Sequence, residues 1–525
     1  MYSEISSAVL DGLYGKSIKV ETYIGNGIPG IKIIGLANTT VTEAKERIRA
    51  ASKISNIKLP NRKIIVNLSP ANIKKEGSHL DLPILCGIYM AGREDGNKLP
   101  PNVGFLGEIG LNGEIKTSKG ILSMILEQKN SNIDKVVVAN SEIIHLKVTN
   151  NITMVPVSHI SEVVELIDSG FSDEYVKKLR EKYIFGEIHN QDVDQNRTNH
   201  GKKKNAYANA SYEEDYIDVN GQDDVKRIMQ IAAAGGHNVI ILGEPGIGKT
   251  MCASRINSIM PDLSDKELLE CMLIKSSTGN DDINDFSRPI RSPYKNITES
   301  AMFGGGQKGR IGEVTMAHNG VLILDEMLEF NRKIIDGFRQ PLEENCIRIS
   351  RVGGNYEYPC NFILIGTANP CPCGYYAGSK RCSCSDLELK KYMKKLSGPV
   401  IDRVDITYLM SREASTSGKV SSKELKLGVE SARKMQLERY NDVDVLNSSL
   451  KAKSLEDSFG ILSDALEILK RYTRQFNISS RGYNKILRLS RTIADLENHK
   501  EITISDISEA LNYRFFDEIL NSYYK

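Results

Sequence analysis

The sequence lacks long apolar runs and has no excess of charge of one sign. No apolar stretch approaches the about 20 residues that a membrane-spanning helix needs. The 69 basic and 67 acidic residues nearly cancel, so there is no global basic field that would by itself indicate nucleic-acid binding. Glu4 and Asp11 stand where a signal peptide would be basic and then apolar. These features argue against a membrane or secreted protein and predict a cytoplasmic one, in which any polyanion site is local.

The chain also lacks a disulfide framework. Cytosolic thiols stay reduced and a chain this long needs no covalent staples. Of the nine cysteines, the isolated ones are interpreted as small core residues: Cys86, Cys252, Cys271, Cys346 and Cys360. The others, here named the cysteine cluster, form two C-x-C pairs separated by eight residues: Cys371, Cys373, Cys382 and Cys384. Four such thiolates can close a tetrahedral Zn²⁺ site, although C-x-x-C is the usual spacing. The alternative is a set of reduced thiols in a glycine-bearing loop.

The sequence divides into four segments, in keeping with about 150 residues per domain. Residues 1–189 alternate β-branched runs with helical stretches such as Val41–Ile54 and Leu80–Ala91, which predicts an α/β or α+β domain. Asn112–Gly113 predicts a tight two-residue hairpin turn. Residues 190–215 are polar and charged and are interpreted as a flexible linker. Strands and helices alternate again over 216–410, and 411–525 has helical periodicity.

The motif GEPGIGKT fits the phosphate-binding pattern G-x-x-x-x-G-K-[ST] and follows an apolar run directly. Its glycines let successive backbone N–H groups converge on phosphate oxygens at the start of a helix. Lys249 is expected to reach the β- and γ-phosphates, and the Thr250 hydroxyl to bind Mg²⁺. The alternative is an ordinary glycine-rich turn, which the flanking strand and helix disfavour. The candidate nucleotide-binding residues of this loop are Gly243, Glu244, Pro245, Gly246, Ile247, Gly248, Lys249 and Thr250.

Two further apolar runs end in polar residues. Val321–Leu324 predicts a buried parallel strand that ends at Asp325 and Glu326. Asp325 is expected to hold the Mg²⁺ shell, and Glu326 to orient and deprotonate the attacking water. A third strand leads to Asn369, which can then hydrogen-bond the γ-phosphate or the water. An Asn-Pro turn without function is the alternative for Asn369. Together these motifs predict a Mg²⁺-dependent ATPase.

These motifs, with IAAAGGHN, FGGG, RQPLEE and ANPCPCG, resemble the ComM (YifB) family. Its members are AAA+ ATPases similar to magnesium chelatase and MCM helicase subunits. The resemblance covers nearly the whole chain. It implies an α/β P-loop core over 216–410, a helical lid over 411–525 and an N-terminal α+β domain, 1–189, that resembles that of Lon protease.

The resemblance also assigns roles to single residues. It implies that Gly221 and Gln222 line the adenine pocket and that Asn369 is a sensor of the γ-phosphate. Arg403 matches the arginine finger, which reaches the ATP site of a neighbouring subunit, and Arg481 matches the second sensor on the lid. A finger that acts on a neighbour implies a ring, expected to be a homo-hexamer.

Two loops could contact a polymer threaded through such a ring. The first is FGGGQKGRIG, with Lys308 and Arg310, and the second is a hairpin turning at Gly353 and Gly354, with Arg351 near its tip. In MCM-like ATPases the corresponding hairpins line the central channel, and basic tips there bind phosphates without sequence preference. The alternative is that these are exposed basic side chains without a ligand.

The function favoured by the resemblance is a DNA helicase or branch-migration motor acting in recombination or natural transformation, with ATP, Mg²⁺ and DNA as its ligands. No membrane and no small-molecule substrate beyond ATP are expected. The alternative is a magnesium chelatase-like or protein-remodelling ATPase. Peptidase activity is disfavoured, because aligning Lys75–Gly77 with the Lon active site places His79, not serine, at the nucleophile position, with Ser78 one residue off.

Overall fold

The computed structural model describes residues 1–93, 100–147, 149, 152–185, 214–279, 286–306, 310–351, 354–375, 382–395, 398–411, 419–451 and 455–514. The chain forms two compact units. Unit 1 comprises Met1–Ala206 and Asp265–Asp285, and unit 2 comprises Tyr207–Ser264 and Phe286–Lys525. Most of the expected linker, 190–215, falls outside the described residues. Within the described ranges, no helix is long and apolar enough to cross a membrane.

Unit 1 is built on a seven-stranded mixed sheet in the order β3-β4-β2-β1-β5-β8-β9. Strands β1 and β2 form an antiparallel hairpin and β4 pairs antiparallel with β2, whereas the other neighbours are parallel. Burial alternates along the second half of β2, as expected for a strand with one face on a core. The strands are β1 (Tyr2–Asp11), β2 (Tyr14–Gly25), β3 (Gly30–Ile34), β4 (Lys63–Ser69), β5 (Val103–Phe105), β8 (Lys135–Ala139) and β9 (Thr153–Val157).

Helices of unit 1 include both of the helical stretches expected from the sequence. The first becomes α1 and the second becomes α2, which is buried over most of its length because it is apolar on nearly every side. The helices are α1 (Thr39–Ile54), α2 (Asp81–Gly92), α3 (Ile121–Asn130), α4 (Ile160–Asp168), α5 (Asp173–Arg180) and α9 (Asp265–Thr278). Short 3₁₀ or π turns cover η1 (Ser78–Leu80), η2 (Asn140–Lys147) and η3 (Glu181–Phe185).

The expected hairpin forms between β6 (Glu108–Ile109) and β7 (Ile115–Lys116). Its turn is longer than the two-residue turn expected. The Gly113 N–H donates to the Gly110 carbonyl at 2.9 Å, so Leu111 and Asn112 occupy the centre of the turn. Gly113 follows with φ 89°, a left-handed conformation that favours glycine.

Helix α9 belongs to unit 1 although it lies within the segment 216–410 expected to form the P-loop core. It packs against α3. The Ser276 carbonyl accepts a hydrogen bond of 2.8 Å from the Gly120 N–H, and the Ser276 hydroxyl accepts one of 3.4 Å from the Leu122 N–H. Both donors lie at the start of α3, where helical N–H groups lack partners within the helix. Helix α9 therefore caps α3.

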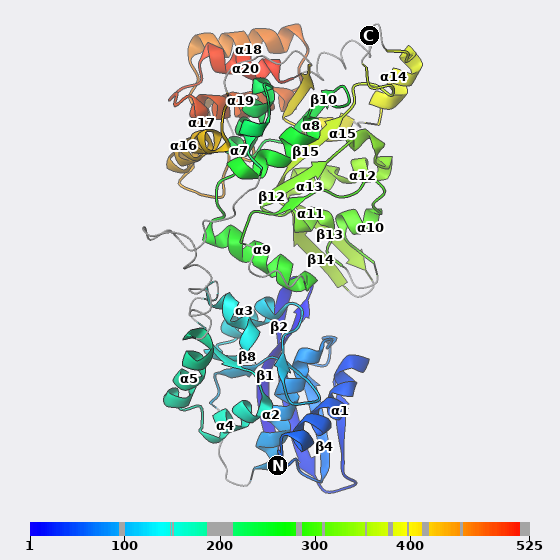
Figure 1. Cartoon of the computed structure of the whole chain (residues 1–525), viewed down its shortest axis with the longest axis vertical. Helices are drawn as coiled ribbons and strands as arrows, with labels where there is room; N and C mark the ends of the chain where they lie inside the picture. Colours follow the sequence, from blue (N-terminus) through cyan, green and yellow to red (C-terminus); the bar gives the residue numbers. More distant parts are fainter. Residues whose placement is uncertain are drawn as a thin grey trace. The chain divides into compact units, whose positions relative to one another are not determined.

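Unit 2 contains a five-stranded sheet in the order β11-β12-β15-β10-β16 whose neighbours are all parallel. As predicted, the strand that precedes Asp325 is buried throughout. Strand β15 lies between β12 and β10, so the loops that follow these three strands meet at one edge of the sheet. The strands are β10 (Val239–Gly243), β11 (Ile290–Arg291), β12 (Gly320–Leu324), β15 (Phe362–Ala368) and β16 (Ile406–Met410) (Figure 1).

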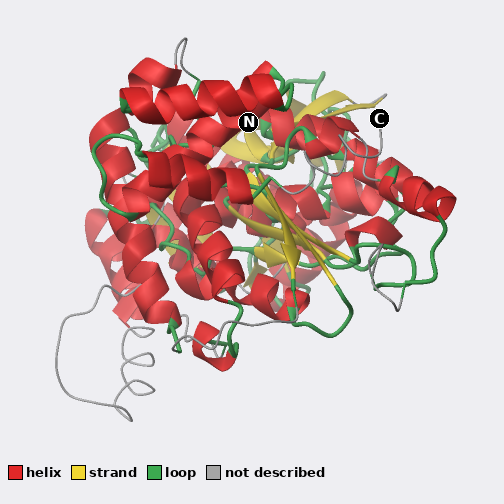
Figure 2. Ribbon diagram, turned by 90° about the horizontal axis from the view of Figure 1, so that it is seen from above, coloured by secondary structure: helices red, strands yellow, loops and turns green. Residues whose placement is uncertain are grey.

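Helices and one hairpin complete unit 2. The hairpin joins β13 (Cys346–Arg351) to β14 (Gly354–Pro359), as expected from the sequence. The C-terminal part, coloured orange and red in Figure 1, consists of helices and loops. Figure 2 shows the helices of the chain in red and its strands in yellow. The helices are α7 (Asp223–Gly235), α8 (Lys249–Ser254), α10 (Glu299–Phe303), α11 (Glu313–Met316), α12 (Arg332–Gly337), α13 (Arg339–Glu344), α14 (Asp386–Met393), α15 (Gly398–Ile401), α16 (Ser422–Tyr440), α17 (Leu455–Phe459), α18 (Ser463–Gln475), α19 (Ser480–Leu496) and α20 (Ile504–Asn512).

Candidate nucleotide-binding site

The GEPGIGKT motif runs from the last residue of β10, through a loop, to the first two residues of α8. Gly246 and Gly248 have φ values of 77° and 94°, which other residues adopt only with strain. Open space surrounds both glycines, so backbone conformation is what requires glycine there. Gly243 differs, because a Cβ atom at this position would collide with Ile247 and approach the Met410 carbonyl of β16. Glycine is thus required by backbone conformation at Gly246 and Gly248, and by close packing at Gly243.

The Lys249 ammonium group lies folded back over this loop. It donates to the carbonyls of Gly243 at 2.6 Å and Glu244 at 2.9 Å, and to the Asn369 side-chain oxygen at 3.2 Å. Burial lowers the pKa of Lys249, and the negative charges of Asp325 and Glu326 oppose that effect. Lys249 begins α8 and Asn369 directly follows β15, so the structure brings these two predicted residues together.

Asp325 accepts hydrogen bonds from two hydroxyl groups. The hydroxyls of Thr250 and Thr367 donate to its Oδ1 atom at 2.7 Å and 2.6 Å. Oxygen ligands of this kind suit Mg²⁺, and Thr250 and Asp325 are the residues that would hold the ion. Thr367 carried no motif in the sequence; its position at the end of β15, beside the strand that carries Asp325, is the signal that points to it.

Glu326 adopts a left-handed backbone conformation, with φ 50°. Its N–H donates to the Thr367 hydroxyl at 3.1 Å, so one threonine contacts both acidic residues. The Glu326 carboxylate forms an ion pair with Lys295, which lies beyond β11. Lys295 was not predicted from the sequence, because a lone lysine in a loop far from any motif has no distinguishing pattern.

Gln222 stands at the start of α7 in a left-handed conformation. Its side-chain amide donates to the Ser411 carbonyl at 3.2 Å. Ser411 directly follows Met410, which pairs with Gly243 across the β10–β16 ladder. Gly221 also has a positive φ, of 64°. Gln222 is therefore tied to the residue that follows β16, the strand beside the phosphate-binding loop.

Arg403 and Arg481 converge on a different carboxylate. Arg403 forms an ion pair with Glu343 of α13, and the Arg481 guanidinium lies 3.9 Å from the second oxygen of the same carboxylate. The paired arginines hold the pKa of Glu343 below its usual range, with the Arg403 hydrogen bond the largest cause. The structure thus places the two predicted arginines together, at Glu343 of the RQPLEE motif.

The loop that carries Arg403 is fixed by buried polar contacts. Lys485 of α19 donates to the carbonyls of Val404 at 2.8 Å and Ile401 at 3.3 Å. The Asn238 amide donates to the Arg403 carbonyl at 3.2 Å, and its oxygen accepts from the Leu364 N–H of β15 at 2.8 Å. The Arg403 loop is therefore connected both to the sheet and to the helix that carries Arg481.

The predicted DNA contacts are only partly described. Arg310 is exposed, and its backbone forms a reciprocal bridge of two 2.8 Å hydrogen bonds with Gly305. Arg351 is the last residue of β13, but its side chain lies outside the described part of the chain. Lys308 also lies outside it.

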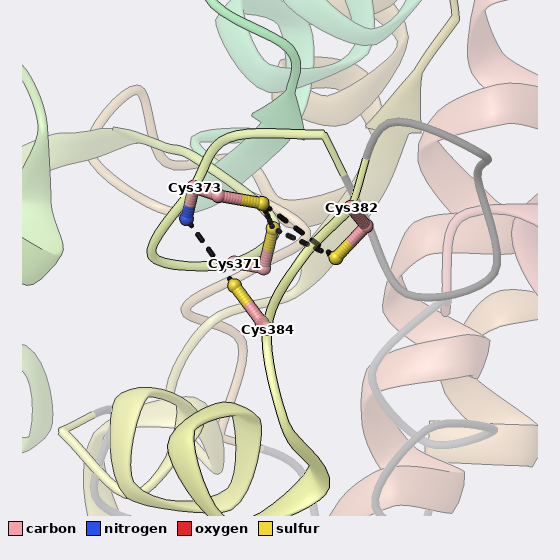
Figure 3. A group of neighbouring side chains, drawn as sticks. All are labelled: Cys371, Cys373, Cys382 and Cys384. Atoms are coloured by element: carbon pink, nitrogen blue, oxygen red, sulfur yellow. Dashed lines mark hydrogen bonds between the residues drawn. The ribbon is translucent and has the colours of Figure 1, made fainter.

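The cysteine cluster lies just beyond Asn369 (Figure 3). Each of its four sulfur atoms lies within 4.8 Å of the others. Backbone N–H groups of Tyr375 and Ser383 are the largest causes that lower the pKa of Cys373, to about 6. Among the isolated cysteines, Cys346 is half-buried, whereas the remaining ones are buried as expected.

Comparison with known proteins covers most of the chain. The family models "Magnesium chelatase, subunit ChlI", "Subunit ChlI of Mg-chelatase" and "Magnesium chelatase, subunit ChlI C-terminal" match residues 215–417, 20–142 and 419–514. The chain is 33% identical to the Escherichia coli protein YifB over 97% of this chain and 96% of the relative. It is 31% identical to the Haemophilus influenzae competence protein ComM, again over 97% of this chain and 96% of the relative.

Proposed function

The chain belongs to the ComM/YifB family of magnesium chelatase-like AAA+ ATPases, and from this we propose that it is a ring-forming motor that couples ATP hydrolysis to movement along DNA. The family resemblance expected from the motifs is confirmed. The proposal extends to a homo-hexamer in the cytoplasm, to a helical lid over 411–525 and to an N-terminal domain resembling that of Lon protease.

The observation that carries the proposal is the meeting of three loops at one sheet edge. Lys249 contacts Asn369 from the loop after β15, and Thr250 contacts Asp325 from the loop after β12. In the proposed reaction, Lys249 neutralises phosphate charge while Thr250 and Asp325 hold Mg²⁺, which supplies further charge neutralisation when bound. Glu326 orients the attacking water and accepts its proton.

A DNA substrate is supported by the relative whose printed name is a competence protein, and by the two loops with basic residues. Arg310 is exposed on a strand-like bridge, as a backbone-phosphate contact requires. We propose branch migration during recombination or transformation as the process. Phosphate contacts of this kind bind without sequence preference and weaken as salt is added.

The test is ATP turnover by the full chain with and without four-way or forked DNA. We expect turnover to rise on adding branched DNA. Turnover should disappear in Lys249→Ala, because this variant lacks the ammonium group that contacts the phosphate-binding loop. Arg310→Ala and Arg351→Ala should weaken DNA affinity and lower its salt dependence, while Arg332→Ala, exposed on α12, serves as the control. Turnover that ignores DNA, together with no DNA binding, would reject the DNA motor.

The second candidate is a chelatase-like or protein-remodelling ATPase. It is favoured by the descriptions of the three matching family models, all of which name a magnesium chelatase subunit. Under this second function the nucleotide site would act in the same way, and only the substrate that the ATPase acts on would differ. Turnover that is insensitive to DNA but stimulated by a protein partner would support it.

Peptide hydrolysis by the N-terminal unit is not proposed. His79, at the expected nucleophile position, is buried, and its Nε2 lies 3.0 Å from the Ala8 carbonyl. The neighbouring Ser78 hydroxyl donates to the Glu108 carboxylate, and buried Lys75 donates to the Pro70 carbonyl. A serine–lysine dyad needs its amine directed at the nucleophile; here each group is directed at another partner.

A further inference from the structure

We propose that the cysteine cluster binds one Zn²⁺ ion and that this metal site holds the segment after Asn369 against the phosphate-binding loop. The proposal has two parts. Metal binding depends only on the cysteine cluster, whereas its effect on nucleotide binding rests on the function proposed above.

The sulfur positions fit a tetrahedral site. Distances from Cys371 to Cys373 and Cys382 are 3.3 Å and 3.9 Å, and Cys373 lies 3.6 Å from Cys382. With Zn–S bonds of about 2.3 Å, the edges of an ideal tetrahedron are about 3.8 Å. All four sulfur atoms lie within 4.8 Å of one another. Figure 3 shows the side chains directed toward a common centre from two stretches of the same loop.

The backbone supports ligation as well. The Cys373 N–H donates to the Cys384 sulfur at 3.4 Å, so the first C-x-C pair orients a ligand of the second. The hydrogen bond holds the Cys384 sulfur beside the first pair, where a shared metal would need it. Each thiol that becomes a ligand releases its proton to solvent, and the ion neutralises part of the resulting negative charge. No change of oxidation state is involved.

The described residues of this loop offer few large apolar side chains. Cys371 is fully buried, but the other three members of the cluster are half-buried. The described residues from Asn369 to Ser385 include Pro370, Pro372 and Tyr375 and no aliphatic side chain larger than proline. Burial of apolar surface is therefore small here, and it is the main stabilising contribution in an ordinary loop of this kind. A metal supplies the missing cross-link between the two C-x-C pairs.

The cluster is joined to the nucleotide site at two points. Cys371 is two residues from Asn369, whose side chain accepts a hydrogen bond from Lys249. Gly374 packs so closely on the phosphate-binding loop that a Cβ atom there would lie 2.9 Å from the Pro245 ring. Its N–H donates to the Cys371 carbonyl at 3.0 Å, closing the turn between the two points. Fixing the cysteines thus fixes both Asn369 and the contact with Pro245.

The first experiment measures metal directly. The full chain, purified under reducing conditions without chelator, should contain one zinc per chain by elemental analysis. Cys382→Ser and Cys384→Ser should lose it. Cys382→His retains a zinc ligand and should keep the metal, and Cys346→Ser, outside the cluster, is the matched control. A protein without zinc whose cluster thiols titrate as free, or one with stoichiometric iron in place of zinc, would overturn the proposal.

The second experiment measures binding of a fluorescent, non-hydrolysable ATP analogue, which carries the γ-phosphate that Asn369 is expected to contact, to the same proteins. Zinc is removed with a mercurial reagent, the mercurial is displaced with excess thiol, and zinc is then added back. This test does not depend on a variant that fails to fold. Without zinc, affinity should fall by about threefold to tenfold, the loss expected for one hydrogen bond, and readdition of zinc should restore it. In Asn369→Ala, zinc removal should have less effect. An affinity unchanged by zinc removal would overturn the positioning role, whereas a chain that binds zinc but never the nucleotide analogue would instead reject the proposed ATPase.

Discussion

Thr367 shows how a single hydroxyl organises two acidic residues. It donates to Asp325 at 2.6 Å and accepts from the Glu326 N–H at 3.1 Å. Its exposed fraction is 0%, so no water can readily take its place. Removing one partner from a buried hydrogen bond leaves the other unsatisfied and costs about 1–3 kcal/mol.

We therefore expect Thr367→Val to lower ATP turnover by about tenfold or more. Valine keeps the shape of threonine but leaves Asp325 and the Glu326 N–H without this hydroxyl. Steady-state turnover and ADP affinity together provide the test, because ADP affinity should change little. Thr367→Ser retains the hydroxyl and should stay near the wild-type rate. Equal losses in the serine and valine variants would show that the methyl group matters and the hydroxyl does not.

His79 links the stability of unit 1 to pH. Burial lowers its pKa from 6.5 to about 4. Between these values the unfolded chain binds a proton that the folded chain does not, so stability is complete above pH 6.5 and falls as pH is lowered toward 4. The loss amounts to at most about 3 kcal/mol. Thermal unfolding at several pH values should show a shallower decline for His79→Gln. If the melting temperatures of the wild type and His79→Gln fall equally as pH is lowered, His79 does not cause this pH dependence.

At the scale of elements, α19 is joined to the Arg403 loop through Lys485. This residue lies one turn after Arg481 and donates to the carbonyls of Val404 and Ile401. A movement of α19 is therefore transmitted to the loop that carries the proposed finger. Such coupling needs a physical link between the two elements, and a buried ammonium group with two carbonyl partners is one.

We expect Lys485→Met to lower ATP turnover by about tenfold, because methionine preserves the volume but leaves both carbonyls without their donor. ADP affinity should be nearly unchanged, since both carbonyl partners of Lys485 lie in the Arg403 loop. Turnover and affinity are measured on the same samples, with Lys470→Met, which is 48% exposed on α18, as the control. A variant with normal turnover would show that the Arg403 loop does not depend on α19.

Features defined by local sequence patterns could be predicted, whereas features defined by tertiary contacts could not. The phosphate-binding loop, the buried strand before Asp325 and the C-terminal helices all have local patterns, and the structure contains them. Lys295 and Lys485 act through tertiary contacts and have no local pattern, and the RQPLEE motif does not show that its Glu343 pairs with Arg403. Helix α9 was not predicted individually within 216–410, and its packing on α3 is a tertiary contact that no local pattern shows.

At the scale of the whole molecule, Arg403 is paired with Glu343 of its own chain, whereas the finger role proposed for it would act on a neighbouring subunit. We expect Arg403→Ala to abolish turnover while rings still assemble, because the transferring phosphoryl group loses a charge partner worth about 10³–10⁵ in rate. Size-exclusion chromatography checks assembly. Mixing Arg403→Ala with Lys249→Ala chains should restore part of the turnover, since each supplies what its neighbour lacks. No recovery in mixed rings would place the finger within its own subunit.

Unit 1 also depends on the chain beyond it. A fragment of residues 1–185 lacks α9, and with it the Ser276 partners of Gly120 and Leu122. We expect this fragment to be less stable than one with residues 265–279 fused to it, by about 2–5 kcal/mol for the lost apolar burial and hydrogen bonds. Denaturant unfolding of the two fragments measures the difference. Equal midpoints would mean that α9 contributes nothing to unit 1.

The membership of α9 in unit 1 has a consequence for biosynthesis. A ribosome releases the chain from its N-terminus, and domains generally fold as they emerge. Unit 1 cannot be completed after its first 206 residues, because Asp265–Asp285 must also have left the exit tunnel. By then β10 and the phosphate-binding loop have already been translated. While the first residues of unit 2 are being synthesised, the nascent N-terminal sheet therefore lacks α9, and the start of α3 is uncapped.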